Sequence, residues 1–392
     1  MALRSTVALG SIFAGALALW FAIHHVPWLG PALADGVRAV VGPKPVAWAE
    51  DTFYGWQDRW NRWRYGDSKP VSYWAASSAS GSAPVASEPA PPVPSGDGGA
   101  GVNGFPPAAF TPPSDRVAGP GDGQWVPAMT APEGGKVVLY KTMVHPDPKR
   151  PFAALAIVAM EMQGIRLHAV AGTVEPRSKD GAKDKRPGLV EASDADNLLA
   201  AFNGGFLTIH GHYGMMVDGT RIGDPRPTSC TVAIYRDGTV RVRSWPELEP
   251  TESQMVAFRQ TPQCLVEQGR VNPALHADNT SWGAAVGGAT VIRRSAIGLS
   301  QDGRILFFGM GDALTVKSIA DGMMAAGAYD IAQLDVNHSF PRFMFYQKKS
   351  GAPGEFTVTG LVPGFTFQTG DYIKTPSFRD FFYVTLKAPP TT

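Results

Sequence analysis

Two aspartates follow strand-like runs in the last third of the chain. Asp312 comes shortly after the apolar run Arg304–Met310, and Asp335 directly follows the run Tyr329–Leu334. Sites are usually built on loops that follow strands. At such a position a carboxylate can act as a nucleophile or as the base that activates water in glycosyl transfer. We predict Asp335 as the catalytic residue and Asp312 as the second candidate; the alternative is that either carboxylate caps or braces a strand end.

A hairpin and a helix are expected to position these aspartates. The runs Ala296–Ser300 and Arg304–Met310 flank an Asp-Gly turn at residues 301–303, a strong hairpin signal. Thr315 can cap a following helix, whose apolar residues recur at helical spacing up to Gly327. The order strand, turn, strand, helix, strand then places both carboxylates at strand ends.

A second polar group, Asn203-Gly204-Gly205, follows the apolar run Leu198–Phe202. Glycines at a strand end let the backbone approach an anion closely, although the same tripeptide is also an ordinary turn. His212 lies a few residues further on and can border the same cleft. Histidines near aspartates could bind a divalent metal, and this alternative stays open. We interpret the histidines as polar loop residues and predict no cofactor.

Arg294 precedes the first strand of the hairpin. A guanidinium matches phosphate oxygens in a bidentate manner and stays charged at any working pH, so Arg294 is a candidate phosphate ligand. Its neighbour Arg293 points to the opposite face of an extended segment, so only one of the two should face inward. The alternative is a surface arginine that pairs with a strand neighbour.

These segments resemble the phosphodiester glycosidase family, that of the lysosomal uncovering enzyme. The resemblance lies in Ala-Phe-Asn-Gly-Gly-Phe at 201–206, Arg-Ser-Ala-Ile-Gly at 294–298, the Asp302-Gly303 turn and Leu334-Asp335, and it spans about residues 136 to 388. It implies hydrolysis of a sugar–phosphodiester linkage. It also implies a catalytic Asp335 and a phosphate-binding group that includes Asn203, Gly204, Gly205 and Arg294.

One departure from the family lies directly after the catalytic candidate. The family reads L-D-G-G-G-S where this chain reads L-D-V-N-H-S, residues 334–339. A β-branched valine resists positive φ, so this turn cannot copy a glycine turn. Either the side chains of Asn337, His338 and Ser339 donate to the phosphate instead, or the domain is an inactive glycan-binding module of polysaccharide assembly. Val336 or Phe340 filling the cleft would favour the second hypothesis.

The composition narrows the fold and the partners. Lys plus Arg number 35 and Asp plus Glu 34 among 392 residues, a formal charge of +1 that argues against nucleic acid as a partner. Many short strand-like runs with Asp-Gly turns and few helices predict an α+β domain on a mixed, mostly antiparallel sheet. We expect its partner to be a carbohydrate or a glycosyl phosphate.

The first third of the chain predicts export and a tether. An uncharged apolar run from Val7 to Ile23 is either a membrane anchor or a cleaved signal, so residues 1–35 are assigned to one of these. Residues 36–74 carry aromatic and basic side chains that suit either a membrane interface or docking on the domain. Residues 75–123, rich in Pro, Ala, Ser and Gly, form a disordered linker, and residues 124–392 form the glycosidase-like domain. These segments predict a cell-envelope protein, anchored through the N-terminal helix or secreted.

The only two cysteines in the sequence are Cys230 and Cys264. In an exported protein they could form a disulfide, which their spacing can neither support nor exclude. They lack the close spacing of a metal-binding pair.

Overall fold

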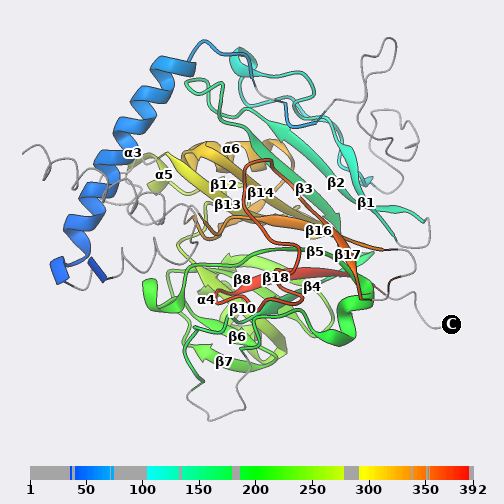
Figure 1. Cartoon of the computed structure of the whole chain (residues 1–392). Helices are drawn as coiled ribbons and strands as arrows, with labels where there is room; N and C mark the ends of the chain where they lie inside the picture. The colour runs from blue at the N-terminus through cyan, green and yellow to red at the C-terminus, as the bar shows by residue number, and fades with distance from the viewer. Residues whose placement is uncertain are drawn as a thin grey trace, which may run out of the picture.

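Short apolar runs separated by turn residues fold into three sheets, described here from a computed structural model (Figure 1). The structure describes residues 36–37, 40–70, 72–74, 104–131, 135–178, 186–277, 291–336, 339–349, 352 and 354–387. Sheet A has the strand order β1 (Val126–Thr130), β2 (Val137–Val144), β3 (Leu155–Glu161), β14 (Ile305–Leu314), β13 (Ile292–Leu299), β15 (Asp330–Gln333), β11 (Val266–Glu267) and β12 (Arg270–Val271).

The other two sheets have five strands each. Sheet B runs β17 (Phe356–Gly360), β16 (Phe343–Lys348), β5 (Leu198–Asn203), β18 (Phe381–Leu386) and β4 (Ile165–Val170). Sheet C runs β7 (Thr220–Gly223), β6 (Met215–Val217), β10 (Met255–Thr261), β8 (Cys230–Tyr235) and β9 (Val240–Ser244). The α-helices described are α3 (Pro43–Tyr65), α4 (Trp245–Leu248), α5 (Ala274–Ala277) and α6 (Val316–Ala325), and short 3-10 turns lie at Asp115–Val117, Ala192–Asn197, Thr208–His210 and Glu249–Gln254.

The predicted class, α+β with mostly antiparallel strands and few helices, is confirmed. Instead of one mixed sheet, however, the described strands form three sheets whose pairings are all antiparallel. The difference arises because about half of the paired strands are not consecutive in the chain, as where β14 pairs with β3 and β5 pairs with β18. Local patterns indicate that a strand exists, but not which strand lies beside it.

The predicted hairpin and helix are both present. Strands β13 and β14 pair on either side of the 301–303 turn, where Gly303 has a φ of 69° that suits glycine. Thr315 accepts a hydrogen bond from the main-chain N–H of Ser318, whose hydroxyl accepts one from Thr315 in return. This capping box starts α6, and α6 ends just before Gly327.

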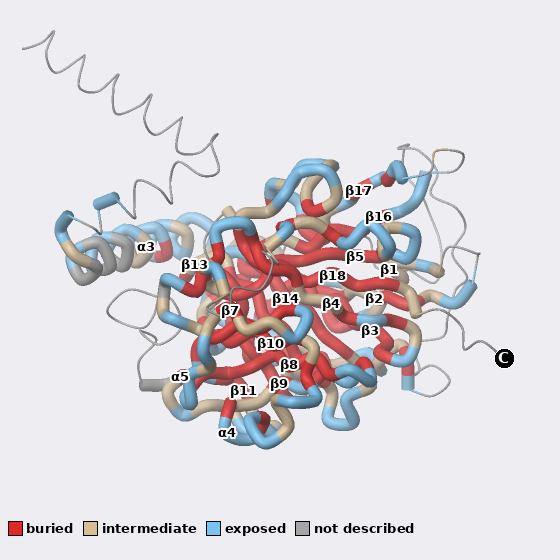
Figure 2. The backbone as a smooth tube through the Cα atoms, turned by 90° about the horizontal axis from the view of Figure 1, so that it is seen from below, coloured by how far each residue is buried: buried red, intermediate tan, exposed pale blue. Residues whose placement is uncertain are grey.

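The main core lies between the sheets. The ring of Phe202 on β5 lies 5.5 Å from that of Phe343 on the neighbouring strand β16. It also lies 4.7 Å from the ring of Phe308 on β14, and this contact joins sheet B to sheet A. On the opposite face of sheet A, buried side chains of α6 such as Ile319 and Met323 form a second cluster. Figure 2 shows the strands as a continuous buried interior with exposed connections around it. Because packing fills the faces of the sheets, the ends of the strands are left to carry a site.

Most of the aromatic-rich segment forms helix α3, which contacts the domain. Asp58 accepts two hydrogen bonds from the guanidinium of Arg150, both 2.7 Å long, and the Tyr65 ring lies 6.2 Å from that of Phe152. The apolar run at residues 7–23 lies outside the described residues. Within the described ranges, no helix is both long enough and apolar enough to cross a bilayer.

Residues 104–123, assigned to the linker by composition, pack on the domain. Phe105 belongs to the cluster between sheet A and α6, with its ring 5.3 Å from that of Tyr140. Asp122 is buried and accepts a hydrogen bond from the main-chain N–H of His145 at 2.9 Å. The packed part of the chain therefore includes residues before 124, and residues 75–103 lie outside the described residues.

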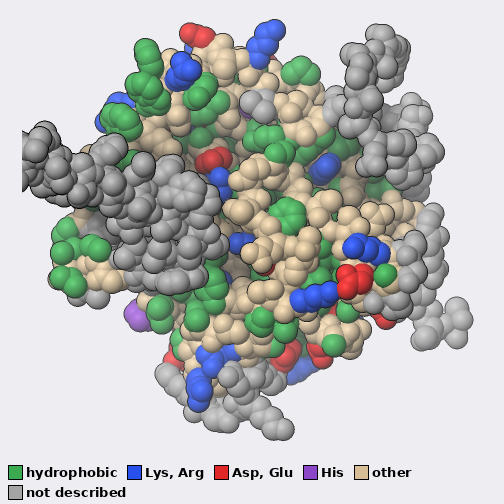
Figure 3. Space-filling model, viewed as in Figure 1, with side chains coloured by type: hydrophobic (Ala, Val, Ile, Leu, Met, Phe, Trp, Pro, Cys, Tyr) green, Lys and Arg blue, Asp and Glu red, His purple; other side chains and the backbone are tan. Residues whose placement is uncertain are grey.

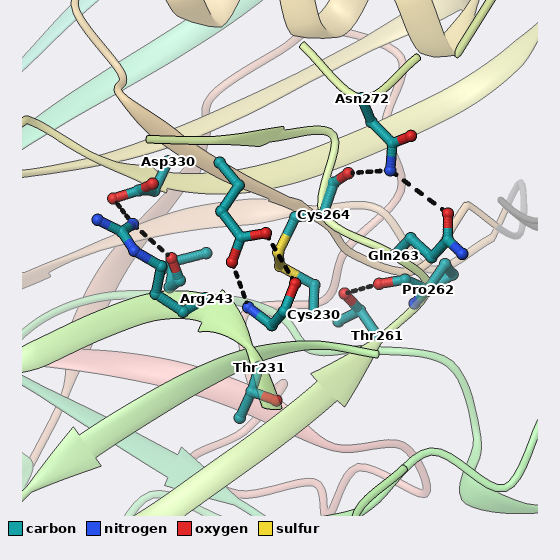
Figure 4. Close-up of a disulfide and its surroundings, with 12 residues drawn as sticks. Cys230, Thr231, Arg243, Thr261, Pro262, Gln263, Cys264, Asn272 and Asp330 are labelled. Carbon is teal, nitrogen blue, oxygen red and sulfur yellow. Dashed lines mark hydrogen bonds and ion pairs between the residues drawn. A yellow bond between two sulfur atoms is a disulfide. The ribbon is translucent and has the colours of Figure 1, made fainter. Parts of the chain in front are cut away.

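A disulfide joins Cys230 at the start of β8 to Cys264 just before β11, which links sheet C to sheet A (Figure 4). The main-chain oxygen of Cys264 accepts a hydrogen bond from Asn272 at 3.0 Å. Arg243 of β9 forms an ion pair with Asp330 of β15 beside it. The two sheets are thus connected by a covalent bond and a neighbouring ion pair.

Loss of this disulfide should destabilise the whole domain. The two cysteines are 34 residues apart, and closing a loop of that length is worth about 3–4 kcal/mol of unfolding free energy in the chain-entropy model. We expect Cys230→Ala/Cys264→Ala to unfold at lower urea concentration than the native chain. Reductant should lower the urea midpoint of the native chain and leave the midpoint of the double variant unchanged. Identical urea midpoints with and without reductant would contradict this role.

Candidate active site

The end of β5 connects sheet B to sheet A through side chains. Asn203 is the last residue of β5, and its Nδ2 donates to the hydroxyl of Ser295 on β13 at 2.8 Å. That hydroxyl donates to the carbonyl oxygen of Asp335 at 2.9 Å. The main-chain N–H of Asp335 donates to the carbonyl oxygen of Gly204 at 3.0 Å. Asn203 and Asp335, which the sequence places in one site, are therefore held together by a ring of hydrogen bonds.

Asp335 faces an arginine. It is 2% exposed, and its Oδ2 forms an ion pair with Nη1 of Arg379. The ring of Phe340 covers the guanidinium, with its centroid 3.8 Å from Cζ. Nε of Arg379 is buried and has no hydrogen-bond partner among the atoms that the structure describes. A carboxylate thus lies beside a guanidinium that keeps a free donor for an anion.

A buried carboxylate supports the turn that follows Asn203. The main-chain N–H of Gly205 donates to Oδ2 of Asp380 at 2.8 Å, and that of Gly204 donates to the Asp380 carbonyl oxygen at 3.0 Å. Nε of Arg259, on β10, donates to the same Oδ2 at 2.8 Å. Both glycine amides, predicted to face a phosphate, are therefore bonded to Asp380 in this structure.

Two opposed effects, burial and the charges of neighbouring side chains, act on the pKa values of Arg259 and Glu175 around Asp380. Burial acts to lower the pKa of Arg259, but the carboxylates of Asp380 and Glu175 outweigh it and raise that pKa above its ordinary value. Burial raises the pKa of Glu175, with Arg259 opposing the shift and Asp380 adding to it. Arg259 and Asp380 form an ion pair, and Glu175 is the neighbouring carboxyl group whose pKa burial raises.

The second catalytic candidate lies apart from these contacts. Asp312, near the end of β14, has a side chain 54% exposed and pairs with Arg293 at 3.3 Å. Arg293 in turn lies over the ring of Phe365, at 4.3 Å. This surface pair is the contact expected of a carboxylate that braces a strand end, so the catalytic role of Asp312 stays a prediction.

Arg294 is fully buried within sheet A. Its Nε donates to the carbonyl oxygen of Leu314 at 3.1 Å and its Nη1 donates to Oε1 of Gln333 at 2.7 Å. Burial lowers the pKa of Arg294 to about 9. Because successive residues of a strand point to opposite faces, Arg294 faces away from the side on which Ser295 contacts Asn203. Its role as a phosphate ligand stays a prediction.

Of the remaining predicted residues, His212 and Ser339 make none of the contacts given above for Asn203 and Asp335. His212 is exposed and adopts a positive φ of 54°. Ser339 accepts a hydrogen bond at its carbonyl oxygen from Nη2 of Arg342 at 2.8 Å. Asn337 and His338 lie outside the described residues. No three His, Cys, Asp or Glu side chains of the described ranges come together as a metal site.

With the geometry established, the chain can be compared with known families. Residues 196–335 match the phosphodiester glycosidase family. The resemblance seen in the sequence is confirmed over this segment, which is shorter than the span of 136 to 388. Asn203, Ser295 and Asp335 lie inside the phosphodiester glycosidase segment, whereas Arg379 and Asp380 lie beyond it.

Solved structures provide weaker similarities. The chain is similar to the zebrafish N-acetylglucosamine-1-phosphodiester alpha-N-acetylglucosaminidase catalytic domain auto-inhibited by its pro-peptide, with 14% identity over 67% of this chain and 87% of that chain and a TM-score of 0.41. It is also similar to a hypothetical protein from Synechocystis, with 9% identity over 67% of this chain and 64% of that chain and a TM-score of 0.39. No curated protein matches the chain.

Four residues that sequence reasoning missed complete the site. Each is polar or charged within or next to an apolar strand, where a lone polar residue should attract attention because burial without a partner is costly. Ser295 lies in the family motif at 294–298, but the sequence argument selected its neighbour Arg294 instead. The four are Ser295, Arg259, Arg379 and Asp380.

The glycine at 204 should be irreplaceable for steric reasons. A Cβ added there would lie 2.0 Å from Oδ2 of Asp380. We expect Gly204→Ala to lower the unfolding free energy by about 2–3 kcal/mol, since the buried carboxylate cannot move without leaving Arg259 unpaired. Gly135→Ala is the matched control, because its Cβ would meet only Ala131, at 3.6 Å. Equal urea midpoints for the two variants would disprove this constraint.

Glu175 should make the domain less stable as the pH rises. Its folded pKa lies above the ordinary 4.5, so above pH 4.5 the folded state holds a proton that the unfolded state has lost. Stability therefore falls as the pH increases from 4.5 through the raised pKa. In Glu175→Gln this decline should be smaller, whereas Glu249→Gln, at an exposed position, should follow the native chain. Urea unfolding between pH 4.5 and 8 measures this, and parallel curves for all three proteins would refute it.

Proposed function

We propose that the protein hydrolyses the bond between a sugar and a phosphodiester, with Asp335 and Arg379 at the reacting centre. The observation that carries the proposal is the buried ion pair of these two residues, built onto the Asn203 turn of the phosphodiester glycosidase segment. A carboxylate and a guanidinium side by side suit a substrate that presents an anomeric carbon next to a phosphate.

Arg379 takes the phosphate side of this reaction. Its side chain is 7% exposed, and an anion that reached its unpartnered Nε would interact in surroundings of low dielectric constant, where a charge-assisted hydrogen bond is strong. Figure 3 shows basic and acidic side chains interspersed over one face of the molecule, so no broad basic area in that view would attract the substrate. Recognition of the phosphate then depends on individual arginines.

Asp335 takes the sugar side. Cleavage at the anomeric carbon expels a phosphate monoester whose second pKa is about 6, so the leaving group needs little protonation at neutral pH. The demand falls on a carboxylate that attacks the anomeric carbon or removes a proton from water. The hydrogen bonds from Ser295 and to Gly204 hold the main chain of Asp335 in place, so its carboxylate needs no reorganisation during the reaction.

The proposed substrates are sugar phosphodiesters of an envelope or extracellular polysaccharide. The support is the sequence of residues 7–23, an uncharged apolar run typical of an anchor or a signal, followed by a Pro-rich stretch. The disulfide between Cys230 and Cys264 is of a kind that persists in oxidising compartments, which agrees with export.

A glycan-binding module without catalysis is the second candidate, and one observation bears on it. Val336 and Phe340 are both buried, and Phe340 covers the arginine that the phosphate would reach. Catalysis then requires Phe340 to move aside, whereas a binding module could use the surface as it stands.

Sugar release from a panel of sugar-1-phosphate diesters by the full chain tests the proposal. Asp335→Asn should lower the rate on the order of 100-fold or more, since a positioned base or nucleophile contributes at least this much. Arg379→Lys keeps the charge but loses the fork, and should raise KM and lower kcat/KM. Chelator in parallel reactions reports on any need for a divalent metal.

Controls separate chemistry from folding. Asp237→Asn, in an exposed turn, should keep full activity, and near-ultraviolet circular dichroism should show that Asp335→Asn is folded. Asp312→Asn should retain most of the activity if Asp312 only braces its strand. Glycan binding without sugar release across the panel would replace the proposed enzyme with the binding module.

A further inference from the structure

Helix α3 presents an aromatic face to solvent. Its members are spaced three or four residues apart over most of their length, so they line one side of the helix. Neighbouring rings contact one another along this side, with centroids 6.1 Å and 4.9 Å apart in the last three members. Each side chain is between 49% and 74% exposed. The aromatic face consists of Trp48, Phe53, Trp56, Trp60 and Trp63.

The opposite side of α3 is the one that docks on the domain. Asp58 is buried in its two-fold hydrogen bond with Arg150, and Tyr65 packs near Phe152. Figure 2 shows α3 projecting from the body of the molecule with much of its surface exposed. The aromatic face is therefore not needed to attach the helix, and its exposure calls for another occupant.

Charged side chains mark the margins of the aromatic face. At about 100° per residue, Arg59 lies beside Trp63, between it and Trp48, and Arg64 lies beside Phe53 on the other side of the aromatic face. Both arginines are exposed, whereas the acidic Asp58 is turned inward and paired. An aromatic stripe with an exposed arginine on each side has the chemistry of the lipid headgroup region, where indole rings lie at the interface and arginines bind phosphates.

We propose that the aromatic face of α3 lies in the headgroup region of a bilayer. The uncharged apolar run at residues 7–23 precedes α3 in the sequence and would deliver the helix to a membrane surface. Because the ion pair of Asp58 with Arg150 fixes α3 to the domain, the contact sets the orientation of the candidate active site relative to the membrane. The proposal is independent of the reaction that the site performs.

A spin label at position 60 of the full chain tests this contact. Both native cysteines are in the disulfide, so a cysteine introduced by Trp60→Cys is the only free thiol. The matched control is Asp237→Cys, in an exposed turn of the domain. In phosphatidylcholine and phosphatidylglycerol vesicles, we expect the label at 60 to lose relaxation by a water-soluble nickel complex and gain relaxation by oxygen. The label at 237 should stay accessible to the nickel complex, with no change when vesicles are added.

Two results would overturn the proposal. One is equal access of the nickel complex to both labels in the presence of vesicles. The other is spin–spin broadening at position 60 that disappears on dilution with unlabelled chain, which would assign the aromatic face to a second copy of the protein. Sugar release by the same labelled chain is measured separately, so a failure of the membrane contact is distinguished from a failure of the proposed enzyme.

Discussion

The buried carboxylate of Asp380 is the constraint on which the candidate site depends. Its side chain is 2% exposed and that of Arg259 is 1% exposed, and charges so far from water are tolerated only as a pair with further hydrogen bonds. The amide of Gly205 supplies such a bond, so the end of β5, the start of β18 and the middle of β10 cannot shift independently. Arg379 is the preceding residue in the chain, so the pairing that fixes the Asn203 turn also places the arginine of Asp335.

Elements with local signals could be predicted from the sequence. The 301–303 turn and the Thr315 cap depend on residues a few positions apart, and the structure has both where the pattern places them. Strand β10 has a weaker local signal, because its sequence, M-V-A-F-R-Q-T, carries an arginine and a glutamine where a buried strand should be apolar. Both side chains are buried there because they have partners, and those partners are distant in the sequence.

The site itself could be predicted only in part, for the same reason. Asn203 and Asp335 could be predicted because each follows an apolar run and lies in a family motif, and the hydrogen bonds that link them through Ser295 and Gly204 agree with a shared site. Arg259 and Asp380 are 121 residues apart, and no local pattern marks either as half of an ion pair. A position next to a strand end does not show which way a side chain points. The pattern therefore could not show that Asp312, the second catalytic candidate, lies at the surface, or that Arg294, the candidate phosphate ligand, is buried.

The turn that departs from the family sequence affects the surroundings of the Arg379 guanidinium. Where relatives have three glycines, this chain places a buried Val336 ahead of Phe340, whose ring faces the guanidinium at 3.8 Å. The ring stabilises the cation but leaves Nε without an acceptor, which is an unfavourable arrangement for a buried donor. A phosphate oxygen at Nε would remove that penalty, while displacement of Phe340 would expose apolar surface. Under the proposed function, substrate binding is therefore coupled to movement of the turn that carries Phe340, and the free energy of that movement lowers the affinity for any anion too small to fill the space.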